Sequence, residues 1–193
     1  KSKETSGIYF ELIKKDEVFL NSKAINEKKG FGLQQLPKPT EGDLFFDMES
    51  DPFSHEKLEY LFGIFYLSGD KEMFKSFWAL SLKEEKNTFK SFLDFLKKHL
   101  KEFPLAHIYH YAPYEKEALR RLSNKYDIGK EFVDNLLRKE KLIDLYKIVR
   151  ESIRISEPKY SIKNLEKFYS DKFGSRSGAV VSAVDSVIYF EDW

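Results

Sequence analysis

Short runs rich in apolar residues indicate β-strands in three segments of the first half of the chain. Residues 44–49 form an apolar run that a Ser-Asp-Pro sequence ends, and residues 60–67 form a second run that Ser-Gly-Asp closes. Apolar residues over 73–78 indicate a third strand. The turn residues between these runs predict three antiparallel strands. The first strand is apolar on both flanks, so we expect it in the centre of a sheet.

Helical periodicity follows these strands. Residues 82–101 repeat apolar side chains at spacings of three and four, which predicts an amphipathic helix. Ser161 is a suitable N-cap for a short helix over residues 162–169. The other expected elements are a fourth strand over 106–111, a helix from about residue 114, a helix over 130–139, a loop over 174–178 and an apolar run over 180–190.

The order of these elements predicts an α/β fold. Three antiparallel strands followed by alternating helices and strands give a mixed sheet flanked by helices. Residues 142–153 fit either a helix or a short strand that runs into a helix, and periodicity does not decide between them. Residues 1–41 are polar, lysine-rich and punctuated by prolines, which indicates an N-terminal arm and linker before a globular domain over 42–193.

The composition narrows the possible classes of function. The 193 residues are 41% hydrophobic, enough for a core, and 33 basic against 32 acidic residues leave a net charge of +1. Any nucleic-acid binding must therefore come from a local patch. The absence of cysteine excludes disulfides, thiolate nucleophiles and cysteine metal sites. No apolar run approaches the roughly 18 to 20 residues of a membrane span, so we expect a cytoplasmic protein that contacts no membrane.

Asp47 and Glu49 are the first candidate functional residues. Side chains two apart on a strand point to the same side, so these carboxylates lie together while Leu44, Phe46 and Met48 point to the other face. Two adjacent buried carboxylates repel each other, and protonation or a shared cation removes this repulsion. Mg²⁺ and Mn²⁺ prefer carboxylate oxygen as a ligand. The simpler interpretation places both acids at a solvated strand end, with Asp51 only capping the turn that follows.

A second cluster lies where the fourth strand runs into a helix. Glu115 falls in the first helical turn, where the helix dipole favours an anion and where strand ends of α/β sheets open onto sites. His110 is close enough in sequence to reach this site, although a hydrogen-bonded strand histidine is the simpler interpretation. Tyr111 and Tyr114 are able to stack on a base of a single strand, or else they are core aromatics. The basic pair Arg120–Arg121 is expected to be mostly solvated charge on a helix face.

Five segments in order resemble a known family. The pattern is similar to the ribonuclease H-like 3′–5′ exonucleases of the DEDD superfamily, and more closely to the RecB-family nucleases with a ribonuclease H-like domain. The resemblance covers about residue 31 to the end. The segments are Gly-Asp-Leu-Phe-Phe-Asp-Met-Glu-Ser-Asp-Pro-Phe (42–53), Leu-Glu-Tyr-Leu-Phe-Gly (58–63), Tyr-His-Tyr-Ala-Pro-Tyr-Glu (109–115), Asp-Leu-Tyr-Lys-Ile-Val-Arg (144–150) and Ser-Glu-Pro-Lys-Tyr-Ser-Ile-Lys (156–163).

The resemblance implies a ribonuclease H-like fold and a site for two Mg²⁺ or Mn²⁺ ions. Asp47, Glu49 and Glu115 correspond to catalytic metal ligands, with Glu115 at a position where most of the superfamily has Asp. Asp144 corresponds to an acid that more often supports the site than binds metal. The implied partners are DNA or RNA, single-stranded, and helicase or RecB-type nuclease segments of a parent protein with a role in DNA repair.

The sequence departs from the family pattern at its far end. The final catalytic Asp of the family belongs to a Tyr-Asn-x-x-Asp-like motif, and no such motif occurs before Trp193. Asp185 and Asp192 are the late acids, and neither has matching surroundings. Because the chain begins with Lys1 rather than Met, we expect a fragment truncated before the fourth ligand, with weak metal binding and poor cleavage.

Two functions follow from these patterns. The first is metal-dependent phosphodiester hydrolysis, as a 3′–5′ exonuclease domain of a larger DNA-processing protein. The alternative is a catalytically incomplete module that binds nucleic acid or acts as a scaffold. The two differ in metal binding and in cleavage that depends on Asp47.

Overall fold

The computed structural model of the chain describes residues 3–5, 8–10, 18–20, 30–54, 56–169, 186, 187 and 190. The chain divides into two compact units, Lys1–Lys38 with Leu145–Arg176 and Pro39–Asp144 with Ser177–Trp193. The second of these, the larger unit, contains the predicted sheet. The sequence-based division after residue 41, into an arm and a nuclease domain, stays a prediction.

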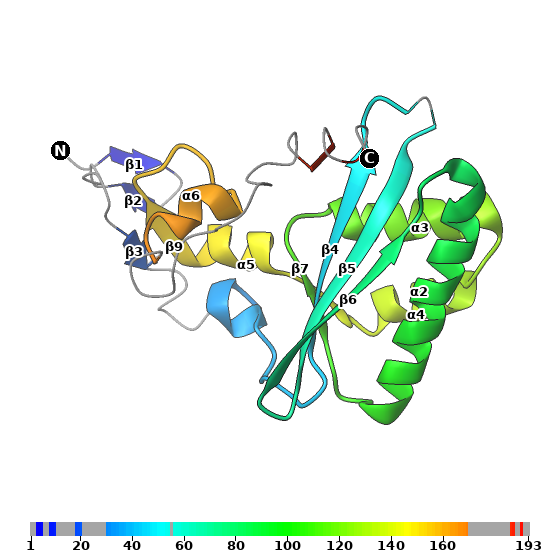
Figure 1. Cartoon of the computed structure of the whole chain (residues 1–193). Coiled ribbons are helices and arrows are strands. Elements are labelled where there is room, and N and C mark those ends of the chain that lie inside the picture. The colour runs from blue at the N-terminus through cyan, green and yellow to red at the C-terminus, as the bar shows by residue number, and fades with distance from the viewer. Residues whose placement is uncertain are drawn as a thin grey trace. The chain divides into compact units, whose positions relative to one another are not determined.

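The larger unit is built on a five-stranded mixed sheet with the strand order β6-β5-β4-β7-β8 (Figure 1). Strands β4, β5 and β6 pair antiparallel, whereas β4, β7 and β8 run parallel. This confirms the three antiparallel strands, the central first strand and the α/β class. The strands are β4 (Leu44–Asp51), β5 (Leu58–Ser68), β6 (Lys71–Trp78), β7 (Ile108–His110) and β8 (Leu142–Asp144).

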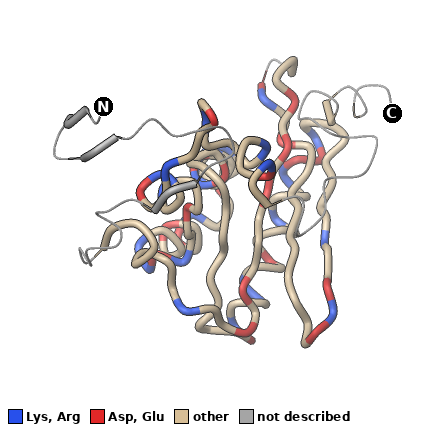
Figure 2. Tube along the Cα trace, turned by 90° about the vertical axis from the view of Figure 1, so that its left-hand side faces the viewer, with Lys and Arg blue, Asp and Glu red and all other residues tan. Residues whose placement is uncertain are grey.

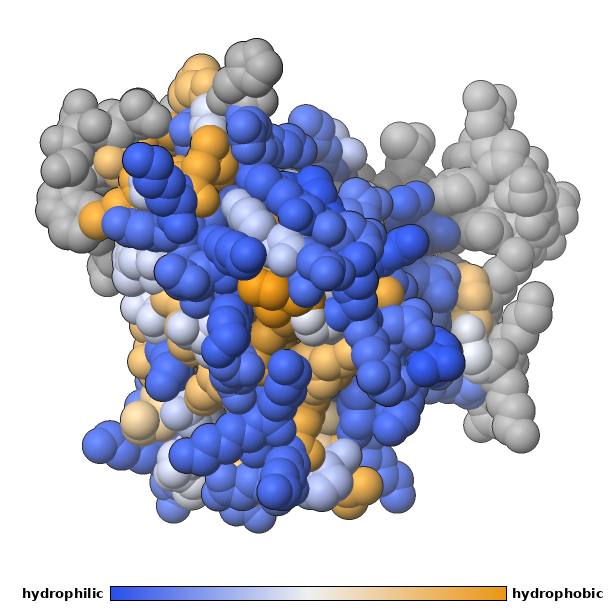
Figure 3. Space-filling model, turned by 90° about the vertical axis from the view of Figure 1, so that its right-hand side faces the viewer, coloured by the Kyte–Doolittle hydropathy of each residue, from blue (hydrophilic) through white to orange (hydrophobic). Residues whose placement is uncertain are grey.

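Three helices cover one face of this sheet: α2 (Leu82–Glu102), α3 (Tyr114–Tyr126) and α4 (Lys130–Arg138) (Figure 1). Their apolar stripes pack on the face to which alternate residues of β4 point. Figure 3 shows that hydrophilic side chains cover most of the outer side of this layer. The core between the layers includes Leu44, Phe46, Met48, Phe62, Ile64, Phe89, Phe92, Leu96, Ile108, Leu119 and Leu122.

Asp43 fixes the start of β4. Its carboxylate accepts hydrogen bonds from the backbone N–H of Thr40 at 2.8 Å, from the Thr40 hydroxyl at 2.7 Å and from the N–H of His107 at 2.8 Å. Burial raises the pKa of Asp43, but these bonds outweigh it and hold the pKa below 3.8. At Gly42, φ is +84° and a Cβ would lie 2.4 Å from the Phe103 ring, so this position requires glycine.

The smaller unit joins segments from both halves of the chain. Strand β1 (Lys3–Thr5) pairs with β2 (Ile8–Phe10), and β3 (Val18–Leu20) pairs with β9 (Ile153–Ile155), both antiparallel. The remaining elements are the 3-10 helix η1 (Gly32–Gln35), α5 (Leu145–Ser152) and α6 (Ile162–Glu166). Glu151 of α5 accepts the N–H of Gly32 at 3.1 Å and bonds the Gln35 amide. The sequence patterns did not predict β9.

Several sequence-based expectations are settled by the structure. Residues 142–153 form a short strand followed by a helix, the second of the two options left open. Ser161 caps α6, accepting the N–H of Asn164 at 3.3 Å, although this helix ends at Glu166 rather than 169. The expected loop 174–178 and most of the run 180–190 lie outside the described residues. None of the described helices is both long and apolar enough to span a membrane.

Candidate functional site

The parallel strands β4, β7 and β8 bring the candidate acids to the end of the sheet at which these three strands finish. In register, Phe45 of β4 lies opposite Tyr109 of β7, and His110 of β7 lies opposite Asp144 of β8. Asp47 and Glu49 lie farther along β4, beyond this paired stretch. The chain leaves β7 at the same end and enters α3, whose first turn carries Glu115.

Asp47 and Glu49 lie on the side of β4 that faces away from the core. Asp47 is exposed and Glu49 is half-buried, while Leu44, Phe46 and Met48 are buried, which confirms the predicted alternation. Asp47 pairs across the ladder with Gly63 of β5, and the Phe74 ring lies over that glycine, 3.4 Å from where a Cβ would stand. The register shifts immediately after Glu49, and such bulges re-aim neighbouring side chains.

Glu115 is a buried carboxylate with an unsatisfied oxygen. Only 4% of the residue is exposed, and its Oε2 has no hydrogen-bond partner among the described residues. The closest charged or chargeable neighbour given by the structure is His110 Nδ1, 3.4 Å from that oxygen. Nδ1 donates its hydrogen bond to the carbonyl of Ala112 at 2.7 Å instead. A buried carboxylate oxygen without a donor is costly unless a cation compensates it.

Asp144, the last residue of β8, is the register partner of His110. Its Oδ1 accepts the backbone N–H of Ala112 at 3.1 Å. Ala112 has a φ of 78°, in the left-handed region that L-residues rarely adopt. This conformation was not predictable from the sequence, because neither glycine nor asparagine occupies position 112.

A second buried carboxylate, Glu59 of β5, was missed by the sequence analysis. It is fully buried, accepts the Tyr114 hydroxyl at 2.7 Å and contacts the Arg121 guanidinium. Burial raises the pKa of Glu59, and burial together with the Glu59 carboxylate raises that of Tyr114 to about 12. The expectation that Arg121 is solvated charge is therefore wrong. The sequence feature that could have indicated a buried carboxylate is the single acid inside the apolar run Leu-Glu-Tyr-Leu-Phe-Gly (58–63).

Glu85 of α2 extends this buried network. Its Oε1 accepts the backbone N–H of Glu59 at 2.6 Å, and its Oε2 is bonded by the Lys125 ammonium at 3.0 Å and by the Tyr126 hydroxyl. The pKa of Tyr126 is raised by burial and by this carboxylate. Strand β5, α2 and α3 are thus tied together by two acids that the protein compensates itself.

Asp51 is the last residue of β4, and Tyr60 lies near the start of the paired strand β5. Asp51 is 5% exposed, and its Oδ1 accepts the N–H of Phe53 at 2.8 Å, which is the turn-capping role of the simpler interpretation. Burial raises the pKa of Tyr60, as do the charges of Glu49 and Asp51. The Tyr60 hydroxyl shares a 2.7 Å hydrogen bond with Ser186. Asp185 and Asp192 lie outside the described residues.

The donor set suits a hard divalent cation. Asp47, Glu49 and Glu115 offer carboxylate oxygens, which Mg²⁺ and Mn²⁺ prefer, and the buried Glu115 Oε2 accepts no hydrogen bond among the described residues. Within the described part of the chain, however, no three His, Asp or Glu side chains are gathered so that they could hold one ion. The chemistry of the residues fits a metal, although their side chains do not converge on one point.

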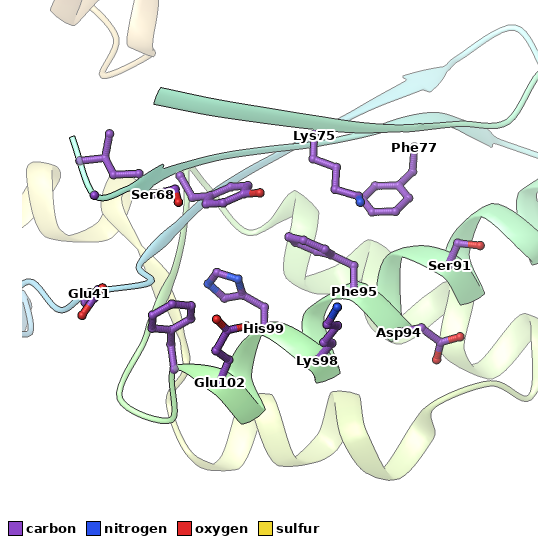
Figure 4. Close-up of a pocket in the computed structure, with 14 residues that line it drawn as sticks. Glu41, Ser68, Lys75, Phe77, Ser91, Asp94, Phe95, Lys98, His99 and Glu102 are labelled. Carbon is purple, nitrogen blue, oxygen red and sulfur yellow. The ribbon is translucent and has the colours of Figure 1, made fainter. Parts of the chain in front are cut away.

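A cavity of about 660 Å³ lies at the opposite end of the sheet, where β4 begins. Figure 4 shows Lys75 and Phe77 of β6 facing Phe95 and His99 of α2 across it. The Lys75 ammonium lies 5.5 and 5.1 Å from the centres of the Phe77 and Phe95 rings. None of the described candidate site residues lines this cavity.

Acidic and basic residues are interleaved along the described chain. In Figure 2, basic and acidic segments alternate along the described trace. This distribution agrees with the net charge of +1. A nucleic-acid substrate would therefore be held by local contacts rather than by a broad positive field.

Comparison with known proteins gives one match. The sequence model of the RNase_H superfamily matches residues 44–193, from the first residue of β4 to the end of the chain. No curated protein and no solved structure matches the chain.

Proposed function

We propose that this chain, which belongs to the RNase H superfamily over residues 44–193, is a metal-dependent nuclease. Its site lies at the end of the sheet where the parallel strands β4, β7 and β8 finish. One observation carries this proposal. Glu115 is buried at that end of the sheet, and its Oε2 accepts no hydrogen bond among the described residues. It lies beside β4, the strand that presents Asp47 and Glu49 on one side. A buried charge of this kind calls for a cation from outside the protein.

Asp47, Glu49 and Glu115 would hold the ions. Two divalent ions, when bound, supply a hydroxide nucleophile near neutral pH and stabilise the leaving 3′ oxygen. Asp47 and Glu49 provide paired carboxylates on the open side of β4, and Glu115 adds a third from the first turn of α3. The buried position of Glu115 excludes water from one side of the site.

The substrate we propose is single-stranded DNA or RNA, degraded from 3′ to 5′. The resemblance to RecB-family nucleases supports this choice, as does Tyr111, a half-buried aromatic three residues after Ile108 that is suited to stacking on a base. Tyr114 suits that role less, since its hydroxyl is engaged by Glu59. We place the activity in the cytoplasm, within a larger DNA-repair protein that has helicase or RecB-type segments.

A catalytically incomplete nucleic-acid-binding or scaffolding module is the second candidate. The observation in its favour is that no three potential ligands converge within the described residues. Such a module would bind a single strand without Mn²⁺ and leave it intact. The same experiment separates the two candidates.

The experiment combines calorimetry with a cleavage assay. Mn²⁺ is titrated into the chain, and single-stranded DNA and RNA oligonucleotides labelled at the 5′ end are incubated with Mn²⁺. We expect Mn²⁺ binding and a ladder of progressively shortened products, which Asp47→Asn reduces at least about 100-fold. Asp70→Asn, in the exposed turn between β5 and β6, is the matched control and should cleave normally. Binding of the strand without Mn²⁺ uptake or cleavage would favour the scaffold.

A further inference from the structure

The corner between β7 and α3 contains a residue in an unfavourable backbone conformation. Ala112 has a φ of 78°, where the Cβ of an L-residue crowds the backbone and where glycine is at ease. Pro113, which follows, has a fixed φ and leads directly into the first turn of α3. The conformation of Ala112 therefore sets the direction in which that turn leaves the sheet.

Two side chains hold Ala112 in this conformation. The Nδ1–H of His110 donates to its carbonyl at 2.7 Å, and Oδ1 of Asp144 accepts its N–H at 3.1 Å. His110 and Asp144 are register partners at the ends of β7 and β8. Both polar backbone groups of one strained residue are thus bonded by side chains from adjacent strands. Strained residues persist where their surroundings over-determine them.

We propose that His110 and Asp144 form a clamp on Ala112 and act as positioning residues for Glu115. Glu115 lies three residues beyond Ala112, and its Oε2 is 3.4 Å from the same His110 Nδ1 that holds the corner. With the clamp in place, α3 starts in the orientation that buries this carboxylate at the end of the sheet where β4, β7 and β8 finish. The inference rests on the proposed function, because it treats Glu115 as a metal ligand and Asp144 as the residue that aims it.

The clamp makes a prediction that distinguishes it from metal ligation by Asp144. Asp144→Ala releases Ala112, so the orientation that binds metal becomes a minor population and Mn²⁺ affinity falls about 10-fold or more. Adding Ala112→Gly removes the penalty of the left-handed conformation and should restore the affinity to within about threefold of the parent chain. Asp144→Asn keeps an acceptor oxygen and should also remain within about threefold.

The matched control places the same glycine substitution elsewhere. Glu140 has a φ of 51° in the turn before β8, so Glu140→Gly relieves a similar backbone penalty without touching the corner. Combined with Asp144→Ala, it should leave the Mn²⁺ affinity low. Equal rescue by both glycines, or loss of affinity in Asp144→Asn and no rescue by Ala112→Gly, would overturn the clamp.

Amide hydrogen exchange tests the clamp without metal. The Ala112 N–H should be protected in the parent chain and in Asp144→Asn, and should exchange at least about 10-fold faster in Asp144→Ala, while the amide of Tyr109 in β7 is unchanged. Ala112 exchange that ignores Asp144→Ala contradicts the clamp, whatever the metal result. If the chain takes up no Mn²⁺ but the exchange pattern holds, the proposed function fails and the clamp stands.

Discussion

Glu59 and Glu115 are two buried carboxylates of the same unit that differ in how their charge is compensated. Glu59 is 0% exposed, and its oxygens meet the Tyr114 hydroxyl and the Arg121 guanidinium. Glu115 is 4% exposed, and its Oε2 has no hydrogen bond within the described residues. The first acid is satisfied by the protein and ties β5 to α3. The second is a buried carboxylate oxygen that accepts no hydrogen bond among the described residues, as expected of a group that binds an external cation.

The largest expected effect comes from removing the cation of Glu59. Arg121→Ala leaves a buried carboxylate whose remaining hydrogen bonds among the described residues come from the Tyr114 hydroxyl. It should lower the free energy of unfolding by about 2 to 3 kcal/mol at pH 7, less than the roughly 3 to 5 kcal/mol of a fully buried pair, because Arg121 is one-third exposed. Urea denaturation measures this loss. Arg120→Ala, at the exposed neighbouring position, should cost less than about 0.5 kcal/mol.

This loss should depend on pH. The pKa of Glu59 is raised above 4.5 by burial, so the folded chain holds its proton to a higher pH than the unfolded chain does. Stability from this group is therefore greatest below pH 4.5 and falls as pH rises through the raised pKa. Arg121→Ala raises that pKa further, and its cost should shrink when the denaturation is repeated near pH 4.5. A pH-independent cost would contradict burial of the Glu59 charge.

The fold was largely predictable from local patterns. Alternation placed Asp47 and Glu49 on one side of β4, and the spacing of apolar residues located α2 and α3. The pairing of β3 with β9 was not predictable, since it joins residues 18–20 to 153–155 and depends on contacts far apart in sequence. The networks at Glu59 and Ala112 were missed for the same reason, because burial and backbone strain arise only when strands and helices meet.

Asp43 provides an intermediate case, a carboxylate stabilised by neutral donors. Asp43→Asn should lose about 1.5 to 2 kcal/mol at pH 7, because an amide oxygen cannot replace a carboxylate that accepts from Thr40 and His107. The sign with pH is opposite to that of Glu59. Since the pKa of Asp43 lies below 3.8, its stabilisation is present above pH 3.8 and is lost as pH falls through the lowered value.

Thermal unfolding at pH 7 and at pH 3 measures this difference between the Asp43→Asn variant and the parent chain. The gap between them should narrow at the lower pH. Asp70→Asn, in an exposed turn, should show no gap at either pH. A gap that widens on acidification would show that Asp43 is not held as a carboxylate.

The smallest expected effect contrasts the two buried acids directly. In metal-free protein, Glu115→Gln removes a buried carboxylate oxygen that accepts no hydrogen bond among the described residues. The free energy of unfolding should stay unchanged or rise by up to about 1 kcal/mol, and the unfolding temperature should stay unchanged or rise with it. Glu59→Gln disrupts the ion pair with Arg121 and should lower the unfolding temperature. Differential scanning calorimetry of the two variants compares them. Equal losses in both would mean that Glu115 is as fully compensated as Glu59.

The most direct measurement is the rise in unfolding temperature that Mn²⁺ gives to the parent chain and to Glu115→Gln. A ligand at 100 times its dissociation constant stabilises a folded protein by about 2.7 kcal/mol. We predict that Mn²⁺ raises the unfolding temperature of the parent chain and of the control Glu117→Gln, exposed in the same first turn of α3, but barely that of Glu115→Gln. An equal rise in all three, or no rise in the parent chain, would contradict the account.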